Sequence, residues 1–181
     1  MKLLFATGNP HKFREAERIL KEYDVIIKRK NVECEEIRAE SCEEVALSSL
    51  RLLRGKMSEP FFVEDSGLFI KALNGFPGTL SSWVFKKIGN EGILKLMRGV
   101  GTRDACFVSS VAAWDGREEG VFSGEVMGKI SRGIKGKGGF GYDPIFIPEG
   151  STKTFAEDKN TKMVCSHRRR ALEKFGEWLM R

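Results

Sequence analysis

Two adjacent carboxylates interrupt an otherwise apolar stretch of the sequence. The run FFVEDSGLFI (residues 61–70) places Glu64 and Asp65 between two apolar segments. Burying such carboxylates costs free energy unless a positive group faces them. A divalent metal or a water awaiting deprotonation would give them a catalytic role, whereas an acidic turn would be purely structural. The pattern alone leaves both interpretations open.

A second acidic segment precedes a helix that we expect over residues 42–54. The sequence SCEE (residues 41–44) fits a capping box for that helix, which explains part of the acidity. Glu33, Glu35 and Glu36 come before the box and are not explained by it. They form either a solvated face or a source of metal ligands.

The segment TGNPHK (residues 7–12) joins an apolar run to a helical pattern. Asn9 suits the N-cap of that helix, and Pro10 suits its first position. Lys12 is unusual because the helix dipole disfavours a cation in the first turn. We therefore expect Lys12 and the free N–H groups of the helix start to hold an anion, most often phosphate. The spacing of a Walker A loop is absent.

The C-terminal helix begins with a similar concentration of charge. His167 and three arginines at positions 168–170 fall in its first turn, and Ser166 is the expected N-cap. Several cations at a helix N-terminus are unfavourable by themselves. They indicate an anion opposite, as at the first helix.

The most glycine-dense stretch is GIKGKGGFGYDPIF (residues 133–146). Glycine lets the backbone approach a ligand closely, and Phe140 and Tyr142 are able to stack on a flat ring. The alternative is a flexible loop whose aromatic residues are tucked into the core. Asp143 and Pro144 lead directly into an apolar run, which favours an ordered loop.

The elements that must position these residues alternate between strands and helices early in the chain. Strand patterns cover residues 2–6, 25–28, 60–63, 68–70, 106–114, 120–130 and 145–147. Helical patterns cover residues 11–22, 42–54, 80–88, 91–98 and 167–180. Asp115 and Gly116 lie between two extended runs and predict a hairpin turn. We therefore predict an α/β fold with a mixed sheet, in a single domain over residues 1–181.

Composition excludes several classes of protein. The chain has 181 residues, 41% of them hydrophobic and 31% charged, which is typical of neither a disordered nor a fibrous protein. Its net charge of +6 allows an anionic partner without naming one. The four cysteines show no CxxC spacing, which argues against a zinc site and fits reduced thiols. No signal-peptide or membrane-spanning run is present, so we expect a cytoplasmic protein with no membrane partner.

Taken in order, these segments resemble the HAM1-like family of inosine and xanthosine triphosphate pyrophosphatases, which act on nonstandard purine nucleotides. The shared motifs span nearly the whole chain. They are Thr7-Gly8-Asn9 with Lys12, Glu64-Asp65-Ser66-Gly67-Leu68, Gly75-Phe76-Pro77-Gly78, Phe140-Gly141-Tyr142-Asp143-Pro144 and Ser166-His167-Arg168.

The resemblance implies an elongated mixed β-sheet flanked by helices, with two lobes and a central cleft, and a homodimer. It implies cleavage of ITP, dITP and XTP between the α- and β-phosphates, with Mg²⁺ as cofactor and Mn²⁺ as a possible substitute. Asp65 would be the metal-linked base and Glu36 the second metal ligand, with Glu35 or Glu33 as alternatives.

The resemblance also assigns substrate contacts. Thr7, Gly8, Asn9, Pro10, His11 and Lys12 would hold the triphosphate, and Ser66 would contact a phosphate. Phe140, with Gly141, and Tyr142 would flank the purine. Asp143, Lys162, His167 and Arg168 would complete the nucleoside site, with Lys159 as an alternative to Lys162.

Three other interpretations compete with this one. A Maf-like pyrophosphatase would share the fold but open with a Ser- and Arg-rich loop. A basic nucleic-acid-binding module would bind with a steep salt dependence, but we expect no stable nucleic-acid partner. A nucleotide sensor without activity would leave Asp65 without a task.

Overall fold

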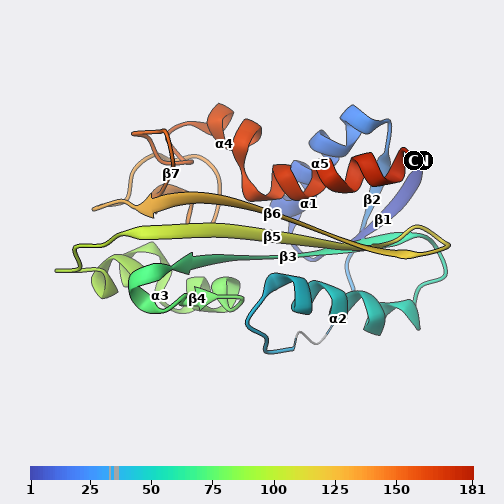
Figure 1. Cartoon of the computed structure of the whole chain (residues 1–181), viewed down its shortest axis with the longest axis horizontal. Helices are drawn as coiled ribbons and strands as arrows, with labels where there is room; N and C mark the ends of the chain where they lie inside the picture. The colour runs from blue at the N-terminus through green and yellow to red at the C-terminus, as the bar shows by residue number, and fades with distance from the viewer. Residues whose placement is uncertain (33, 35–36) are drawn as a thin grey trace. The chain divides into compact units, whose positions relative to one another are not determined.

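A computed structural model describes residues 1–32, 34 and 37–181 of the chain (Figure 1). The described residues form two compact units. Unit 1 comprises residues 1–65, 109–124 and 167–181, and unit 2 comprises residues 66–108 and 125–166.

The seven strands form one mixed sheet with the order β2-β1-β3-β5-β6-β7, and β4 pairs with β3. The strands are β1 (Lys2–Ala6), β2 (Ile26–Lys30), β3 (Phe61–Ile70), β4 (Pro77–Gly78), β5 (Asp104–Trp114), β6 (Glu119–Ile130) and β7 (Phe146–Pro148). The helices are α1 (Pro10–Leu20), α2 (Cys42–Arg54), α3 (Ser81–Leu96), α4 (Lys159–Cys165) and α5 (His167–Leu179). β1 is parallel to β2 and β3, whereas β4 is antiparallel to β3 and β7 is antiparallel to β6. The predicted mixed α/β fold is therefore confirmed.

In unit 1 the sheet lies between two helical layers (Figure 1). Phe61 and Val63 of β3 pack with apolar residues of α2. Phe62, between them, stacks on Phe5 of β1 and contacts Phe175 of α5. Successive side chains of a strand point to opposite faces, so α2 covers one face of β3 and α5, packed on α1, covers the other.

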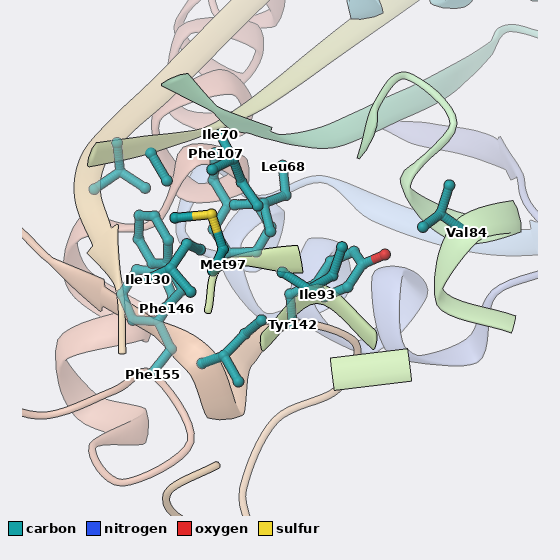
Figure 2. Close-up of a cluster of buried hydrophobic side chains, with 13 residues drawn as sticks. Leu68, Ile70, Val84, Ile93, Met97, Phe107, Ile130, Tyr142, Phe146 and Phe155 are labelled. Carbon is teal, nitrogen blue, oxygen red and sulfur yellow. The ribbon is translucent and has the colours of Figure 1, made fainter. Parts of the chain in front are cut away.

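The core of unit 2 is a separate cluster of buried side chains, shown in Figure 2. It joins Leu68 and Ile70 of β3 to Ile93 of α3, to Met97 directly after that helix, and to Phe146 of β7. The hydroxyl of Ser81 ties the start of α3 to β3 and β4. Its Oγ accepts a hydrogen bond from Leu68 N at 2.8 Å and donates one to Gly78 O at 2.7 Å.

The structure departs from the predicted elements in several places. β3 runs without a break from Phe61 to Ile70, so the two short strands predicted there are one strand, and the alternative of an acidic turn at Glu64 and Asp65 is wrong. The helical patterns at 80–88 and 91–98 belong to α3, which is kinked at Gly89 with a positive φ of 59°. Helix α4 was not predicted. The hairpin turn is confirmed, because Asp115 Oδ1 accepts hydrogen bonds from the backbone of residues 117 and 118 between β5 and β6.

None of the helices in the described part of the chain is both long and apolar enough for a membrane span.

Candidate active site

The start of α1 is capped by the side chain of Asn9, the residue directly before the helix. Asn9 Oδ1 accepts from His11 N at 2.9 Å and from Lys12 N at 3.3 Å, and Pro10 occupies the first turn. Thr7 Oγ1 in turn accepts from Asn9 N at 3.1 Å. The predicted cap is confirmed, but the expectation of free N–H groups at positions 11 and 12 is wrong because Asn9 uses both. The Lys12 ammonium does not serve the cap.

The two adjacent carboxylates point to opposite faces of the sheet. Because β3 is continuous, Glu64 shares the α1 and α5 face with Phe62, and Asp65 shares the α2 face with Val63. Phe5 of β1 pairs with Phe62, so both carboxylates lie beyond the carboxyl end of β1, where the chain turns into α1. In α/β sheets this edge is the usual place for ligands.

Glu64 is the centre of an ion cluster in unit 1. Its carboxylate Oε2 lies 3.0 Å from Lys12 Nζ, and its Oε1 accepts from Arg168 Nε and Nη2 at 3.2 and 3.1 Å. Ser109 Oγ donates to the same Oε1 at 2.6 Å, and Arg168 Nη1 donates to Glu15 Oε2 at 2.6 Å. The side chains of Glu64 and Arg168 are 1% and 2% exposed.

Burial and ion pairing shift the pKa values of Glu64 and Arg168 in opposite directions. Burial by itself would raise the pKa of Glu64, but the charges of Arg168 and Lys12 hold that pKa well below its ordinary value. Burial opposes the charge of Arg168, and Glu64 and Glu15 nevertheless raise the pKa of its guanidinium. Glu64 and Arg168 are therefore both charged at neutral pH.

Asp65 lies on the other face of β3, beside the start of α2. It is 8% exposed, and the thiol of the buried Cys42 hydrogen-bonds to it. Burial and the Asp65 charge raise the pKa of that thiol far above its ordinary value. Ser41 Oγ accepts from Glu44 N at 3.2 Å, which confirms the predicted N-cap of α2.

The donor chemistry of Asp65 fits Mg²⁺, which is bound in enzymes by one or two carboxylates together with waters and substrate phosphates. The second predicted ligand, Glu36, and its alternatives Glu33 and Glu35 lie outside the described residues. Within the described part of the chain, no group of three or more His, Cys, Asp or Glu side chains is arranged to hold a metal.

The cations at the start of α5 are matched by carboxylates of the protein itself. Arg168 pairs with Glu15 and Glu64, as described above. Arg169 pairs with Glu22 Oε2 at 2.6 Å and with Glu173 Oε1 at 2.7 Å. The argument that these arginines indicate an external anion is therefore wrong for positions 168 and 169. His167, also predicted as a substrate contact, is 3% exposed.

In unit 2 the glycine-rich loop is ordered around Asp143. Its Oδ2 accepts from Lys162 Nζ and from Phe140 N, both at 2.7 Å, and Asp143 and Lys162 are almost fully buried. The Lys162 ammonium lies 4.3 Å from the centroid of the half-buried Phe140 ring. Asp143 thus connects the loop to α4. Lys159, the alternative to Lys162, is exposed.

Tyr142 differs from the expectation that it flanks a purine. It is 4% exposed and belongs to the buried cluster of unit 2 (Figure 2). Its hydroxyl donates to Ser81 O at 3.2 Å. Its ring packs edge-on against Phe85 at 5.2 Å. This placement matches the alternative of an aromatic residue tucked into the core, because the apolar ring and its hydroxyl both find partners there.

The two other predicted substrate contacts of unit 2 are Gly141 and Ser66. Gly141 accepts a hydrogen bond at its carbonyl from Asn90 Nδ2 at 3.1 Å and has a positive φ of 60°. Ser66 is half-buried in β3. The roles of these residues in substrate binding stay predictions.

The sequence model of the Ham1 family matches residues 3–178. The chain belongs to the Ham1 family. It is 49% identical over 180 residues to the dITP/XTP pyrophosphatase of Methanopyrus kandleri, covering 98% of this chain and 96% of that protein. It is 49% identical over 179 residues to the dITP/XTP pyrophosphatase of Korarchaeum cryptofilum, with 99% and 96% covered. The structure of a Ham1 protein from Coxiella burnetii superposes with a TM-score of 0.86 at 27% identity, with 99% and 98% covered.

The sequence analysis missed the ion cluster around Glu64. Glu64 was considered only with Asp65, as a carboxylate for a metal or a water, and Glu15 and Ser109 were not considered. Glu15 carried a detectable signal, because it lies three residues after Lys12 on one face of α1. Ser109 carried none, since a serine in an apolar strand has no distinctive neighbours in the sequence.

Proposed function

We propose that the chain hydrolyses nonstandard purine nucleoside triphosphates, with ITP, dITP and XTP as substrates, to the monophosphate and pyrophosphate. The single observation that carries this proposal is membership of the Ham1 family together with relatives named dITP/XTP pyrophosphatase at 49% identity over nearly the whole chain. The arrangement at the end of β1 is compatible with it, since a lysine and an acidic residue suited to a metal lie in the same unit.

The chemistry follows from the residues of unit 1. Lys12 contacts the triphosphate through its ammonium, as a point charge suited to phosphate oxygens. Asp65 takes a proton from a water molecule whose oxygen bonds to the α-phosphorus. The bond from that phosphorus to the oxygen bridging to the β-phosphorus breaks, and pyrophosphate leaves with the electron pair. Asp65 and Glu36 would hold Mg²⁺, which supplies charge neutralisation for the phosphates.

The residues of unit 2 would contact the nucleoside. Phe140 offers a half-buried aromatic face, and a ring face stacks on any base without distinguishing among them. Base selection therefore requires hydrogen-bonding groups at the edge of the ring. We propose that Arg168 is one of these groups, as the resemblance implies, although its guanidinium already serves Glu15 and Glu64.

The test is a pyrophosphate-release screen over ITP, dITP, XTP, dATP, ATP, GTP and UTP. We expect the first three to be hydrolysed with the highest kcat/KM. Preference for a pyrimidine triphosphate would instead support a Maf-like activity. Turnover of none of them, combined with salt-sensitive retention of DNA or RNA on a filter, would replace the proposal with a nucleic-acid-binding function.

We also propose a cytoplasmic homodimer. The cellular location agrees with the four cysteines, all within the described residues, which form no disulfide. Light scattering on a sizing column measures the oligomeric state, and a mass near 20.4 kDa would show a monomer and overturn the dimer.

A further inference from the structure

Glu64 is a buried carboxylate to which the proposed chemistry gives no task. It makes two kinds of contact with Lys12: the ammonium Nζ lies 3.0 Å from the carboxylate Oε2 and donates to the backbone carbonyl of Glu64 at 3.2 Å. Its other oxygen, Oε1, accepts from Arg168 and from Ser109. One residue thus holds cations from α1 and α5 at once.

These contacts make Glu64 a poor metal ligand or base. Oε1 already accepts three hydrogen bonds, and Oε2 faces the Lys12 ammonium. A metal ion or a reacting water would have to displace a cation from a side chain that is 1% exposed. Glu64 also faces the α1 and α5 layer, whereas Asp65 faces α2.

We propose that Glu64 is a positioning residue that fixes the Lys12 ammonium for binding the triphosphate. A lysine side chain is a flexible four-carbon stem with three N–H donors. Glu64 holds this ammonium from two sides, because Nζ donates to the Glu64 carbonyl at 3.2 Å and lies 3.0 Å from the carboxylate Oε2. The ammonium is thereby restrained at one position, from which it would meet a phosphate oxygen. This role rests on the proposed function, because it requires Lys12 to bind phosphate.

The direction in which Glu64→Gln changes phosphate affinity distinguishes a positioning role from a purely electrostatic one. Glu64 is negative, so its removal would tighten the binding of a polyanion if long-range electrostatics were the only term. Positioning predicts the opposite, because an unrestrained lysine side chain must be ordered when the ligand binds. We therefore expect Glu64→Gln to weaken binding of the phosphates by about tenfold.

The experiment is a double-mutant cycle with Glu64→Gln, Lys12→Met and the double variant. The readouts are KM and kcat for ITP, and the Kd of inorganic tripolyphosphate with Mg²⁺ by calorimetry. In the chain with Lys12 we expect Glu64→Gln to raise the KM and this Kd about tenfold and to change kcat less. In the Lys12→Met background we expect Glu64→Gln to change the Kd of tripolyphosphate, a ligand without a base for Arg168 to contact, by less than about twofold. The matched control is Glu22→Gln, which removes a carboxylate paired with Arg169 and should leave all three values unchanged.

Tighter or unchanged binding of tripolyphosphate in Glu64→Gln would overturn the proposal. Equal weakening with Lys12 and with Lys12→Met would also overturn it, because that result would indicate a general structural effect. If Glu64→Gln does not fold by circular dichroism, Glu64→Asp takes its place in the cycle, because it keeps the charge but shortens the reach to Lys12. If the wild-type chain binds tripolyphosphate but releases no pyrophosphate from any triphosphate, the proposed function fails while the cycle in Kd still decides the role of Glu64. If the wild type binds no tripolyphosphate, the positioning role is overturned as well.

Discussion

Lys162 and Asp143 form a buried ion pair in unit 2, and its disruption is a quantitative test of the structure. The Nζ to Oδ2 distance is 2.7 Å, and the side chains are 5% and 3% exposed. Replacing Lys162 by Met keeps an unbranched side chain of similar volume but leaves the Asp143 carboxylate without its counter-charge. Breaking such a pair from one side typically costs about 3–5 kcal/mol in unfolding free energy.

We expect the loss in unfolding free energy for Lys162→Met to lie at the lower end of that range. Asp143 Oδ2 keeps its hydrogen bond from Phe140 N, which continues to stabilise the carboxylate. We therefore expect a loss of about 3 kcal/mol. For a chain of this size, that loss corresponds to a fall in Tm of about 6–12 °C.

The assay is urea unfolding followed by circular dichroism, with Tm from a thermal scan. Lys159→Met is the matched control, because Lys159 is an exposed lysine one turn earlier on the same helix, and we expect it to change stability by less than about 0.5 kcal/mol. The double variant Asp143→Asn with Lys162→Met removes both charges and should be more stable than Lys162→Met alone. A loss below about 1 kcal/mol for Lys162→Met, or a double variant less stable than the single one, would refute the reasoning.

Four further predictions follow from individual residues. Asp65→Asn should lower kcat for ITP at least about 10²-fold while Kd for tripolyphosphate changes little, and near-normal kcat would remove its role as base. EDTA should abolish pyrophosphate release and added Mg²⁺ should restore it, whereas full activity in EDTA would contradict the metal proposal. Gly67→Ala should cost about 1–3 kcal/mol in urea unfolding because its Cβ would collide with the carbonyl oxygen of Gly78 in β4, and an unchanged midpoint would contradict this close approach of the two strands. Burial and Asp65 raise the pKa of the Cys42 thiol, so this thiol should resist a thiol reagent in the native state even at pH 9. An unfolded cysteine is about half ionised at that pH, and fast labelling of Cys42 before unfolding would contradict its placement.

The elements that were predicted well carry their signals in adjacent residues. Helix α2 begins and ends as predicted because Ser41 caps it and its apolar positions recur at helical spacing. The strand β1 and the start of α1 were likewise evident from an apolar run followed by Asn9 and Pro10. In these segments local propensity and tertiary packing favour the same structure.

The failures occur where a distant residue decides the outcome. The sequence EDSG (residues 64–67) has the composition of a turn, but the structure places it within β3. Glu64 is buried in this strand because Lys12 and Arg168 supply the opposite charges. Arg168 is 104 residues away from Glu64 in the sequence, so no local pattern reveals the pair. The same reason explains why the arginines of α5 suggested an external anion.

The charges of the cluster also bear on the need for a metal. Lys12 and Arg168 carry two positive charges, and their partners Glu64 and Glu15 carry two negative ones. Asp65 adds a further negative charge in the same unit, so these five residues have no surplus positive charge to offset a triphosphate. In the proposed mechanism Lys12 would therefore orient a phosphate oxygen without neutralising the substrate. A divalent cation bound with the substrate would supply the missing charge, and this balance is the physical reason for expecting turnover to depend on Mg²⁺.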